Sequence, residues 1–113
     1  MNKDLQIAKK TVQTEIKALK KLSLSFNRSS NFSKTVNLLS KMKGKCLVIG
    51  VGKSYLVSLK VSATLSSLGT PSVAFSANDL QHGGLGAIQK NNDVLLVFSV
   101  SGESSELNSI LRY

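Results

Sequence analysis

The 113 residues include 15 lysines and arginines, 6 acidic residues and one cysteine, so the formal net charge is +9. This length allows one small domain, no apolar run approaches the ~20 residues of a membrane span, and a single cysteine excludes an internal disulfide and a cysteine-based zinc cluster. Because no apolar leader follows the basic N-terminal residues, the sequence predicts a cytoplasmic protein that does not enter a membrane.

The positive charge is concentrated in the first 45 residues, where the only acids are Asp4 and Glu15. Such a segment can bind nucleic acid. However, neither an arginine cluster nor interleaved aromatic residues accompany the lysines. Solvated helix faces are therefore the favoured interpretation, and nucleic acid is not an expected partner. Steep salt dependence of DNA binding would contradict this.

Residues 1–43 predict a helical segment made of two helices. In the first, from about 4 to 24, apolar residues recur every three or four positions along one side of an amphipathic helix. They are Leu5, Ala8, Val12, Ile16, Leu19 and Leu22. A polar break at 27–30 precedes the second helix, for which Ser29 or Ser30 is the expected N-cap and Gly44 the stop.

Residues 44–113 predict an α/β domain. Strands are expected at 46–49, 72–76 and 94–99, with a helix at 53–68, a helical turn that Asn78 could cap, and a final helix. Alternating strands and helices of this kind favour right-handed crossovers and a parallel sheet in three layers. Three strands are few, and the final helix reaches Tyr113 after about two turns. The expectation is therefore a truncated domain, or one completed by another chain.

The helix at 53–68 also predicts self-association. Between residues 54 and 68 the only charged side chain is Lys60, while apolar residues lie on several sides of the helix axis. A helix of this kind needs cover on several faces. We therefore expect a homo-oligomer, either a dimer or a tetramer.

The loop 50–54, with the sequence Gly-Val-Gly-Lys-Ser, joins the first strand to the following helix. Glycines there let backbone N–H groups approach an anion, and the helix N-terminus favours negative charge. A Walker loop would need glycine at Leu47, and a dinucleotide fingerprint would need glycine at Tyr55, so neither motif is present. The alternative is a tight turn with a surface lysine.

A second polar loop, 99–106, follows the third strand with the sequence Ser-Val-Ser-Gly-Glu-Ser-Ser-Glu. Both loops leave the carboxyl ends of parallel strands, so they are expected at one edge of the sheet, where open α/β folds bind ligands. Hydroxyls and a helix N-terminus suit a phosphate monoester. The alternative is ordinary capping, with Ser101 as the N-cap and Glu103 complementing the helix dipole.

Taken in order, these motifs resemble the sugar isomerase (SIS) family, in particular its arabinose-5-phosphate isomerase branch, over residues 44–107. The motifs that carry the resemblance are Gly-Val-Gly-Lys-Ser at 50–54, Ala-Thr-Leu at 63–65, Gly-Thr-Pro at 69–71, His-Gly at 82–83 with Leu-Gly at 85–86, and Ser-Gly-Glu-Ser-Ser-Glu at 101–106. The resemblance implies a flavodoxin-like, Rossmann-type sheet and the interconversion of D-arabinose 5-phosphate and D-ribulose 5-phosphate through an enediol, a step toward lipopolysaccharide precursors.

The resemblance also implies roles for particular residues. The phosphate would be held by Ser54, Ser99, Ser101 and Ser104, with Gly52, Gly102 and Glu103 in the same loops. The sugar would contact Gly69, Thr70 and His82, and Lys53 and Glu106 would be catalytic. No metal or organic cofactor is implied. A metal-binding histidine of the family does not carry over, because Ser76 and Ala77 stand where the family has His-Pro.

Other departures concern activity. Tyr55 replaces a glycine beside the phosphate loop, and Gly84 stands where the family often has aspartate. The family's further catalytic glutamate and histidine are not among the 113 residues, so we expect the chain by itself to be a poor isomerase. The alternative function is a non-catalytic sugar-phosphate-binding module, as SIS domains are in some regulators.

Overall fold

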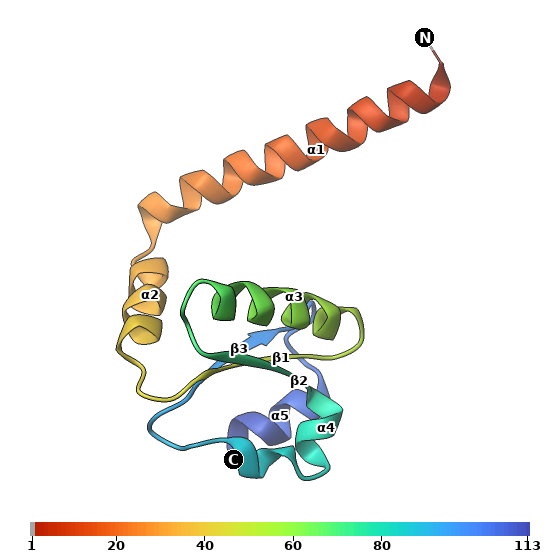
Figure 1. The fold of residues 1–113 in the computed structure, drawn as a ribbon. Helices are drawn as coiled ribbons and strands as arrows, with labels where there is room; N and C mark the ends of the chain where they lie inside the picture. The colour runs from red at the N-terminus through yellow and green to blue at the C-terminus, as the bar shows by residue number, and fades with distance from the viewer. Residues whose placement is uncertain (1) are drawn as a thin grey trace. The chain divides into compact units, whose positions relative to one another are not determined.

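The computed structural model describes residues 2–113 and is drawn in Figure 1. The chain divides into two compact units, with the boundary between Asn37 and Leu38. No helix formed by residues 2–113 is both long enough and apolar enough to cross a bilayer.

The first unit is helical, as expected. It contains α1 (Lys3–Ser25), the short 3₁₀ helix η1 (Phe26–Arg28) and the beginning of α2 (Asn31–Lys41). Both serines that the sequence offers as the N-cap bind the start of α2: Ser29 Oγ accepts a hydrogen bond of 3.1 Å from the backbone N–H of Asn31, and the Ser30 carbonyl accepts one of 3.0 Å from the Lys34 amide. The rings of Phe26 and Phe32 pack with their centroids 5.0 Å apart.

The second unit is built on a parallel sheet with the order β2-β1-β3. Its strands are β1 (Cys46–Gly50), β2 (Ser72–Ser76) and β3 (Val94–Phe98). At the amino edge Cys46 pairs with Ser72 and Val94, and at the carboxyl edge Gly50 pairs with Ser76 and Phe98. Every residue of the central strand β1 is buried.

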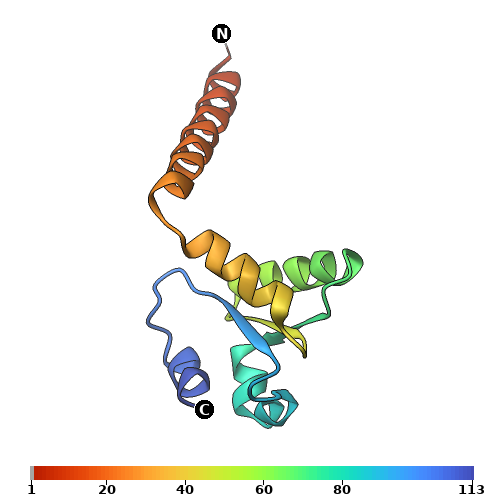
Figure 2. The same ribbon diagram turned by 90° about the vertical axis from the view of Figure 1, so that its left-hand side faces the viewer.

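Helices cover both faces of this sheet, which confirms the expected three-layer α/β architecture. Figures 1 and 2 show α3 (Lys53–Ser67) on one face and α4 (Ala77–Gln81) with α5 (Ser105–Arg112) on the other. Because side chains of a strand alternate between faces, every second residue of β1 joins the α4–α5 side. The core there consists of Leu47, Ile49, Ala77, Leu80, Leu107 and Ile110.

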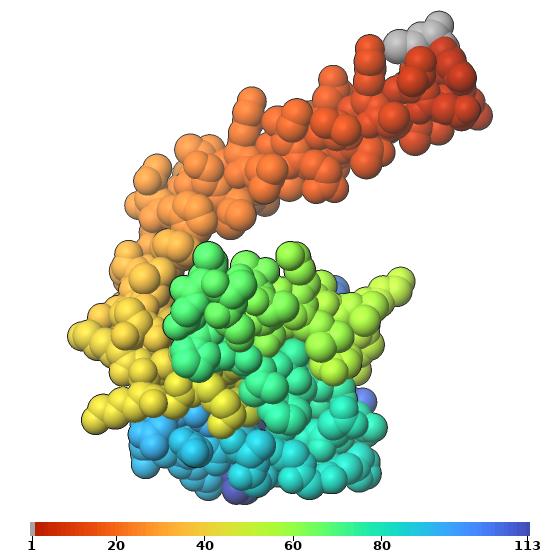
Figure 3. All heavy atoms as spheres, viewed as in Figure 1, coloured from red at the N-terminus to blue at the C-terminus, as the bar shows by residue number. Residues whose placement is uncertain are grey.

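The opposite face is lined by small groups. α3 buries only two residues, Ser58 and Ser62, and the Ser58 hydroxyl donates to the Ser54 carbonyl at 2.9 Å. Among its larger side chains, Tyr55, Val61 and Leu65 are half-buried, whereas Leu56 is 63% and Leu59 44% exposed. Figure 3 shows α3, in green, at the surface of the second unit.

Two N-caps differ from those that the sequence suggests, which are Asn78 for the turn after β2 and Ser101 in the capping alternative for the second loop. Ser76 rather than Asn78 caps α4, because the last residue of β2 is still extended and its Oγ accepts a hydrogen bond of 3.1 Å from the Asp79 amide. Ser104 rather than Ser101 is the N-cap of α5. Gly102, with φ of +72°, redirects the chain after Ser101, so the helix begins only at Ser105.

At the amino edge of the sheet, Asp93 joins the segment before β1 to the segment before β3. Its Oδ1 accepts from the Lys45 backbone N–H at 2.8 Å, and its Oδ2 accepts from the Gln89 amide at 2.8 Å and from Lys45 Nζ at 3.0 Å. The Asp93 side chain is only 1% exposed. Burial alone would raise the pKa of this carboxyl, but the hydrogen bonds from Gln89 and Lys45 and the Lys45 charge hold the pKa below its usual value.

Cys46 begins the central strand and is completely buried. Burial raises the pKa of its thiol and outweighs a hydrogen bond with Ser72 that lowers it. Since the thiolate is the reactive form, this side chain is a small core residue and not a nucleophile.

Candidate functional site

A hollow of about 400 Å³ lies at the carboxyl edge of the sheet, between the loop after β1 and the loop after β3. It is lined by Val51, Lys53, Ser54, Phe98, Ser99, Val100, Ser101 and Ser104. The two loops therefore come together in the way that a parallel sheet requires. The N-termini of α3 and α5 both border this hollow.

The first loop is held tightly against the start of α3. Gly52 has φ of +56°, a conformation that residues with a side chain rarely adopt. Within the turn, the Ser54 amide donates to the Val51 carbonyl and the Tyr55 amide to the Gly52 carbonyl, both at 3.0 Å. At Gly50 an added Cβ would lie 2.5 Å from the Ser54 carbonyl carbon and oxygen, so only glycine lets the helix start this close to the strand.

The second loop is organised by its own hydroxyls. Ser99 Oγ accepts from the Gly102 amide at 2.9 Å, and Ser101 Oγ accepts from the Glu103 amide at 3.2 Å. Ser104 caps α5 through its backbone and makes no side-chain cap hydrogen bond. Its hydroxyl therefore lines the hollow without being required by the helix.

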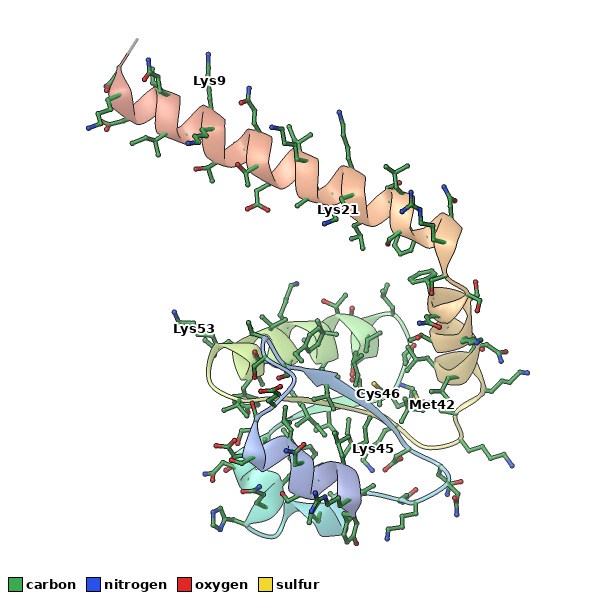
Figure 4. All side chains as sticks on the ribbon, turned by 180° about the vertical axis from the view of Figure 1, so that it is seen from behind. Lys9, Lys21, Met42, Lys45, Cys46 and Lys53 are labelled. Carbon is green, nitrogen blue, oxygen red and sulfur yellow. The ribbon has the colours of Figure 1, made fainter. Side chains whose placement is uncertain are left out.

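These features suit an anionic group. Lys53 is the single charged residue among those that line the hollow, and Figure 4 shows it extending away from the first turn of α3. Two helix N-termini add partial positive charge, and the serine hydroxyls can donate hydrogen bonds. Among residues 2–113 no cluster of His, Cys, Asp and Glu side chains could hold a metal ion.

Five of the site residues that the sequence predicts line this one hollow, and the glycines belong to its loops. The five are Lys53, Ser54, Ser99, Ser101 and Ser104, accompanied by Gly52 and Gly102. Sequence reasoning missed the apolar part of the lining, which is Val51, Phe98 and Val100. Their positions beside the predicted loop residues were the only signal that could have indicated them.

Three other predicted residues do not line the hollow. Glu106 is half-buried in the first turn of α5, where its Oε2 accepts from the Ser105 hydroxyl at 3.3 Å. Glu103 is exposed in the second loop. His82 is exposed at the C-terminal end of α4.

Gly69 and Thr70 lie elsewhere. They end α3 and precede β2, so they stand at the amino edge of the sheet, while the hollow is at the carboxyl edge. Gly69 has φ of +91°, and the Thr70 amide donates to the Leu65 carbonyl at 2.9 Å, as in a helix C-terminal stop. The predicted convergence of these two residues with the serine loops is therefore not found within one chain.

Two further hollows occur at the amino edge. One of about 520 Å³ lies beside Lys41, Lys43 and the segment 91–94, and one of about 310 Å³ lies beside Gly44, Gly69 and Thr70. Although the first is larger than the hollow at the carboxyl edge, no helix begins at either. Ligands of open α/β sheets bind at the carboxyl edge, so the hollow between the serine loops is the better candidate site.

Comparison with known proteins gives a consistent result. The family model described as "SIS domain" matches residues 38–113. The arabinose 5-phosphate isomerase KdsD of Francisella tularensis is 35% identical over 114 residues, which cover 98% of this chain and 34% of that protein. The arabinose 5-phosphate isomerase KpsF of Escherichia coli O6:H1 is 37% identical over 99 residues, which cover 88% of this chain and 30% of that protein.

A solved structure is similar to this chain as well. A protein of Escherichia coli CFT073 in complex with arabinose 5-phosphate superposes with a TM-score of 0.84 and 34% identity, covering 99% of this chain and 59% of that one. The chain thus spans about a third of the length of the curated relatives named above.

Proposed function

The chain belongs to the SIS domain family, and from this premise we propose that it binds a phosphorylated sugar, with the phosphate in the hollow between the two serine loops. The reaction proposed for this site is the interconversion of D-arabinose 5-phosphate and D-ribulose 5-phosphate. The relatives named for this activity, and a related structure that contains arabinose 5-phosphate, support the choice of substrate.

The observation that carries the proposal is the meeting of two helix N-termini with serine hydroxyls and one lysine around a single hollow. A phosphate monoester presents several acceptor oxygens and nearly two negative charges at neutral pH. Hydroxyl and backbone donors satisfy those oxygens, and the helix dipoles stabilise the charge. The sugar would then extend from the hollow toward α5.

The proposed reaction moves one proton between neighbouring carbons. After ring opening, a base removes the proton from C2 of the aldose while the carbonyl oxygen on C1 takes up a proton, and the electrons form an enediol. Return of a proton to C1, with loss of the hydroxyl proton on the C2 oxygen, gives the ketose. Glu106, in the first turn of α5, is the proposed carboxylate that carries this proton, and Lys53 is the proposed cation that stabilises the oxyanion.

Removal of a serine hydroxyl from the hollow should weaken phosphate binding. For Ser101→Ala and Ser104→Ala we expect the pentose phosphate affinity measured by calorimetry to fall by about 1.5–3 kcal/mol, the value of a hydrogen bond to a charged group. Ser104→Ala tests the contact alone, because this hydroxyl does not cap the helix. Ser67→Ala, at the other end of α3, is the matched control, and unchanged affinity in both loop variants would refute the phosphate assignment.

The reaction is tested by a coupled assay of ketose formation from D-arabinose 5-phosphate. Lys53 and Glu106 are present, but the 113 residues do not include the family's further glutamate and histidine. A missing positioned acid or base costs about 10²–10⁴-fold in rate. We therefore expect the 113-residue chain to bind the sugar phosphate and to turn over well below ~1 s⁻¹; faster turnover would show that these residues form a complete catalytic set.

Self-association through α3 is part of the proposal. The face that α3 turns away from the sheet carries Leu56 and Leu59, both exposed, and a second copy could cover them. Leu56→Glu with Leu59→Glu should lower the molar mass measured by light scattering, whereas Leu111→Glu, at an exposed leucine of α5, should not. A wild-type chain that is monomeric at tens of micromolar would contradict this. In such an assembly, Gly69 and Thr70 could contribute to the ligand site of another subunit.

A further inference from the structure

Gln81, the last residue of α4, is bound to the helix that carries Glu106. The Gln81 side-chain Nε2 donates to the Glu106 backbone carbonyl at 2.9 Å and to Ser109 Oγ at 2.6 Å. The Ser109 hydroxyl donates to the same carbonyl at 3.0 Å. Because a glutamine amide has two N–H donors, one side chain of α4 holds both residues of α5 at once.

These hydrogen bonds are the directional part of the contact between the two helices. Among residues 2–113, Gln81 makes all the side-chain hydrogen bonds that join α5 to another element. The remainder of the contact is apolar and is made by Leu80, Leu107 and Ile110. Apolar burial has no preferred direction, whereas a hydrogen bond requires particular distances and angles. Gln81 therefore sets how α5 is shifted and rotated relative to α4.

The loop before α5 does not fix the start of the helix by itself. Gly102 has φ of +72°, and Ser104 caps α5 without a side-chain hydrogen bond. Within the described residues, the Glu106 carboxylate has one hydrogen bond, of 3.3 Å, from the hydroxyl of its neighbour Ser105 on the same helix. Since that partner moves with the helix, the place of the carboxylate depends on where the backbone of α5 is held.

We propose, on the basis of the function proposed above, that Gln81 is a positioning residue for the isomerase reaction. It holds the backbone of α5 at Glu106, and so places the carboxylate that carries the proton between C1 and C2. A general base acts only within hydrogen-bond reach of its proton, and a misplacement of about 1 Å can lower the rate about 10²-fold. Gln81 does not line the hollow and acts only through Glu106.

Replacement of the Gln81 amide tests this role in the full chain. Gln81→Met keeps the length of the side chain and removes the donor, so kcat for ketose formation from D-arabinose 5-phosphate should fall about tenfold with KM unchanged. Gln81→Lys retains a donor of similar reach and should recover most of kcat. Gln89→Met, at an exposed glutamine whose side chain makes no hydrogen bond within residues 2–113, is the matched control.

A second substitution, at Glu106, separates positioning from stability. Glu106→Gln removes the carboxylate, so the addition of Gln81→Met should cause no further fall in kcat. If Gln81 only stabilised the packing of α4 and α5, the double variant would show the loss of Gln81→Met again, and the proposal would be overturned. Unchanged kcat in Gln81→Met beside a fall in Glu106→Gln would overturn the role of Gln81 alone. Unchanged kcat in Glu106→Gln would instead refute the proposed role of Glu106, and with it that of Gln81.

A binding measurement tests the same role without turnover. The probe 4-phospho-D-erythronohydroxamate carries a phosphate at one end and, at the other, a planar hydroxamate that imitates the enediol. Such analogues gain affinity from the groups that act on the reacting atoms. In calorimetry, Gln81→Met should weaken binding of this probe about tenfold and leave the affinity for inorganic phosphate unchanged, because the serine loops form the phosphate site. Equal weakening of both probes, or of neither, would overturn the proposal.

Discussion

Asp93→Asn is expected to lower the free energy of unfolding by about 1.5–3 kcal/mol at pH 7, the usual worth of a hydrogen bond to a charged group. The carboxylate accepts two hydrogen bonds from Lys45 and one from the Gln89 amide and is 1% exposed. In the variant, the amide NH₂ group replaces one of these acceptor oxygens and faces a donor. A small domain has only about 5–15 kcal/mol of stability in total, so denaturant unfolding should show a large shift.

The effect should depend on pH in a defined direction. The folded pKa of Asp93 lies below its usual value of 3.8, so the ionised carboxylate stabilises the fold above that value. The contribution disappears as the pH falls through the lower folded pKa. The difference in stability between wild type and Asp93→Asn should therefore be constant above about pH 5 and shrink below about pH 4.

The exposed Asp79 of α4 provides the matched control. Asp79→Asn makes the same chemical change at a solvated site and should alter stability by no more than about 0.5 kcal/mol. If Asp93→Asn were equally mild, or if its effect did not shrink in acid, the ion pair with Lys45 would not stabilise the fold as the geometry indicates.

Gly50→Ala should destabilise the second unit by about 3 kcal/mol or more, the upper range for overpacking. The new Cβ would lie 2.5 Å from the Ser54 carbonyl group and 2.6 Å from the Tyr55 nitrogen. These are backbone atoms of the first turn of α3, so the helix start must move. Because that turn borders the hollow between the serine loops, pentose phosphate binding should be lost as well.

Gly86→Ala is the control for this change, because an added Cβ there has no atom within 4 Å. Both variants are compared with wild type by denaturant unfolding and by calorimetry with the sugar phosphate. A Gly50→Ala variant with wild-type stability and affinity would show that α3 can move away from β1 without loss of stability. The close approach of helix and strand would then not be required.

The sequence by itself was sufficient for the order and type of the elements and for most of the candidate site. The apolar residues 46–49 predicted the strand β1, and the loops after two strands predicted hydroxyls at one sheet edge. These inferences succeed because a parallel sheet with right-handed crossovers places the carboxyl ends of its strands together. Local sequence and topology are then enough to bring Ser54 and Ser101 to the same hollow.

Only the tertiary structure decided where some of the predicted residues lie and which residues cap the helices. Gly69 and Thr70 follow the family motif in sequence, yet their loop enters a strand instead of leaving one, so within one chain they lie at the opposite edge from the serines. The true caps Ser76 and Ser104 depended on where the extended backbone ends, which residue types alone do not show. Likewise, only the tertiary structure shows that α3 buries Ser58 and Ser62 while Leu56 and Leu59 stay exposed, and that helix and strand approach closely at Gly50.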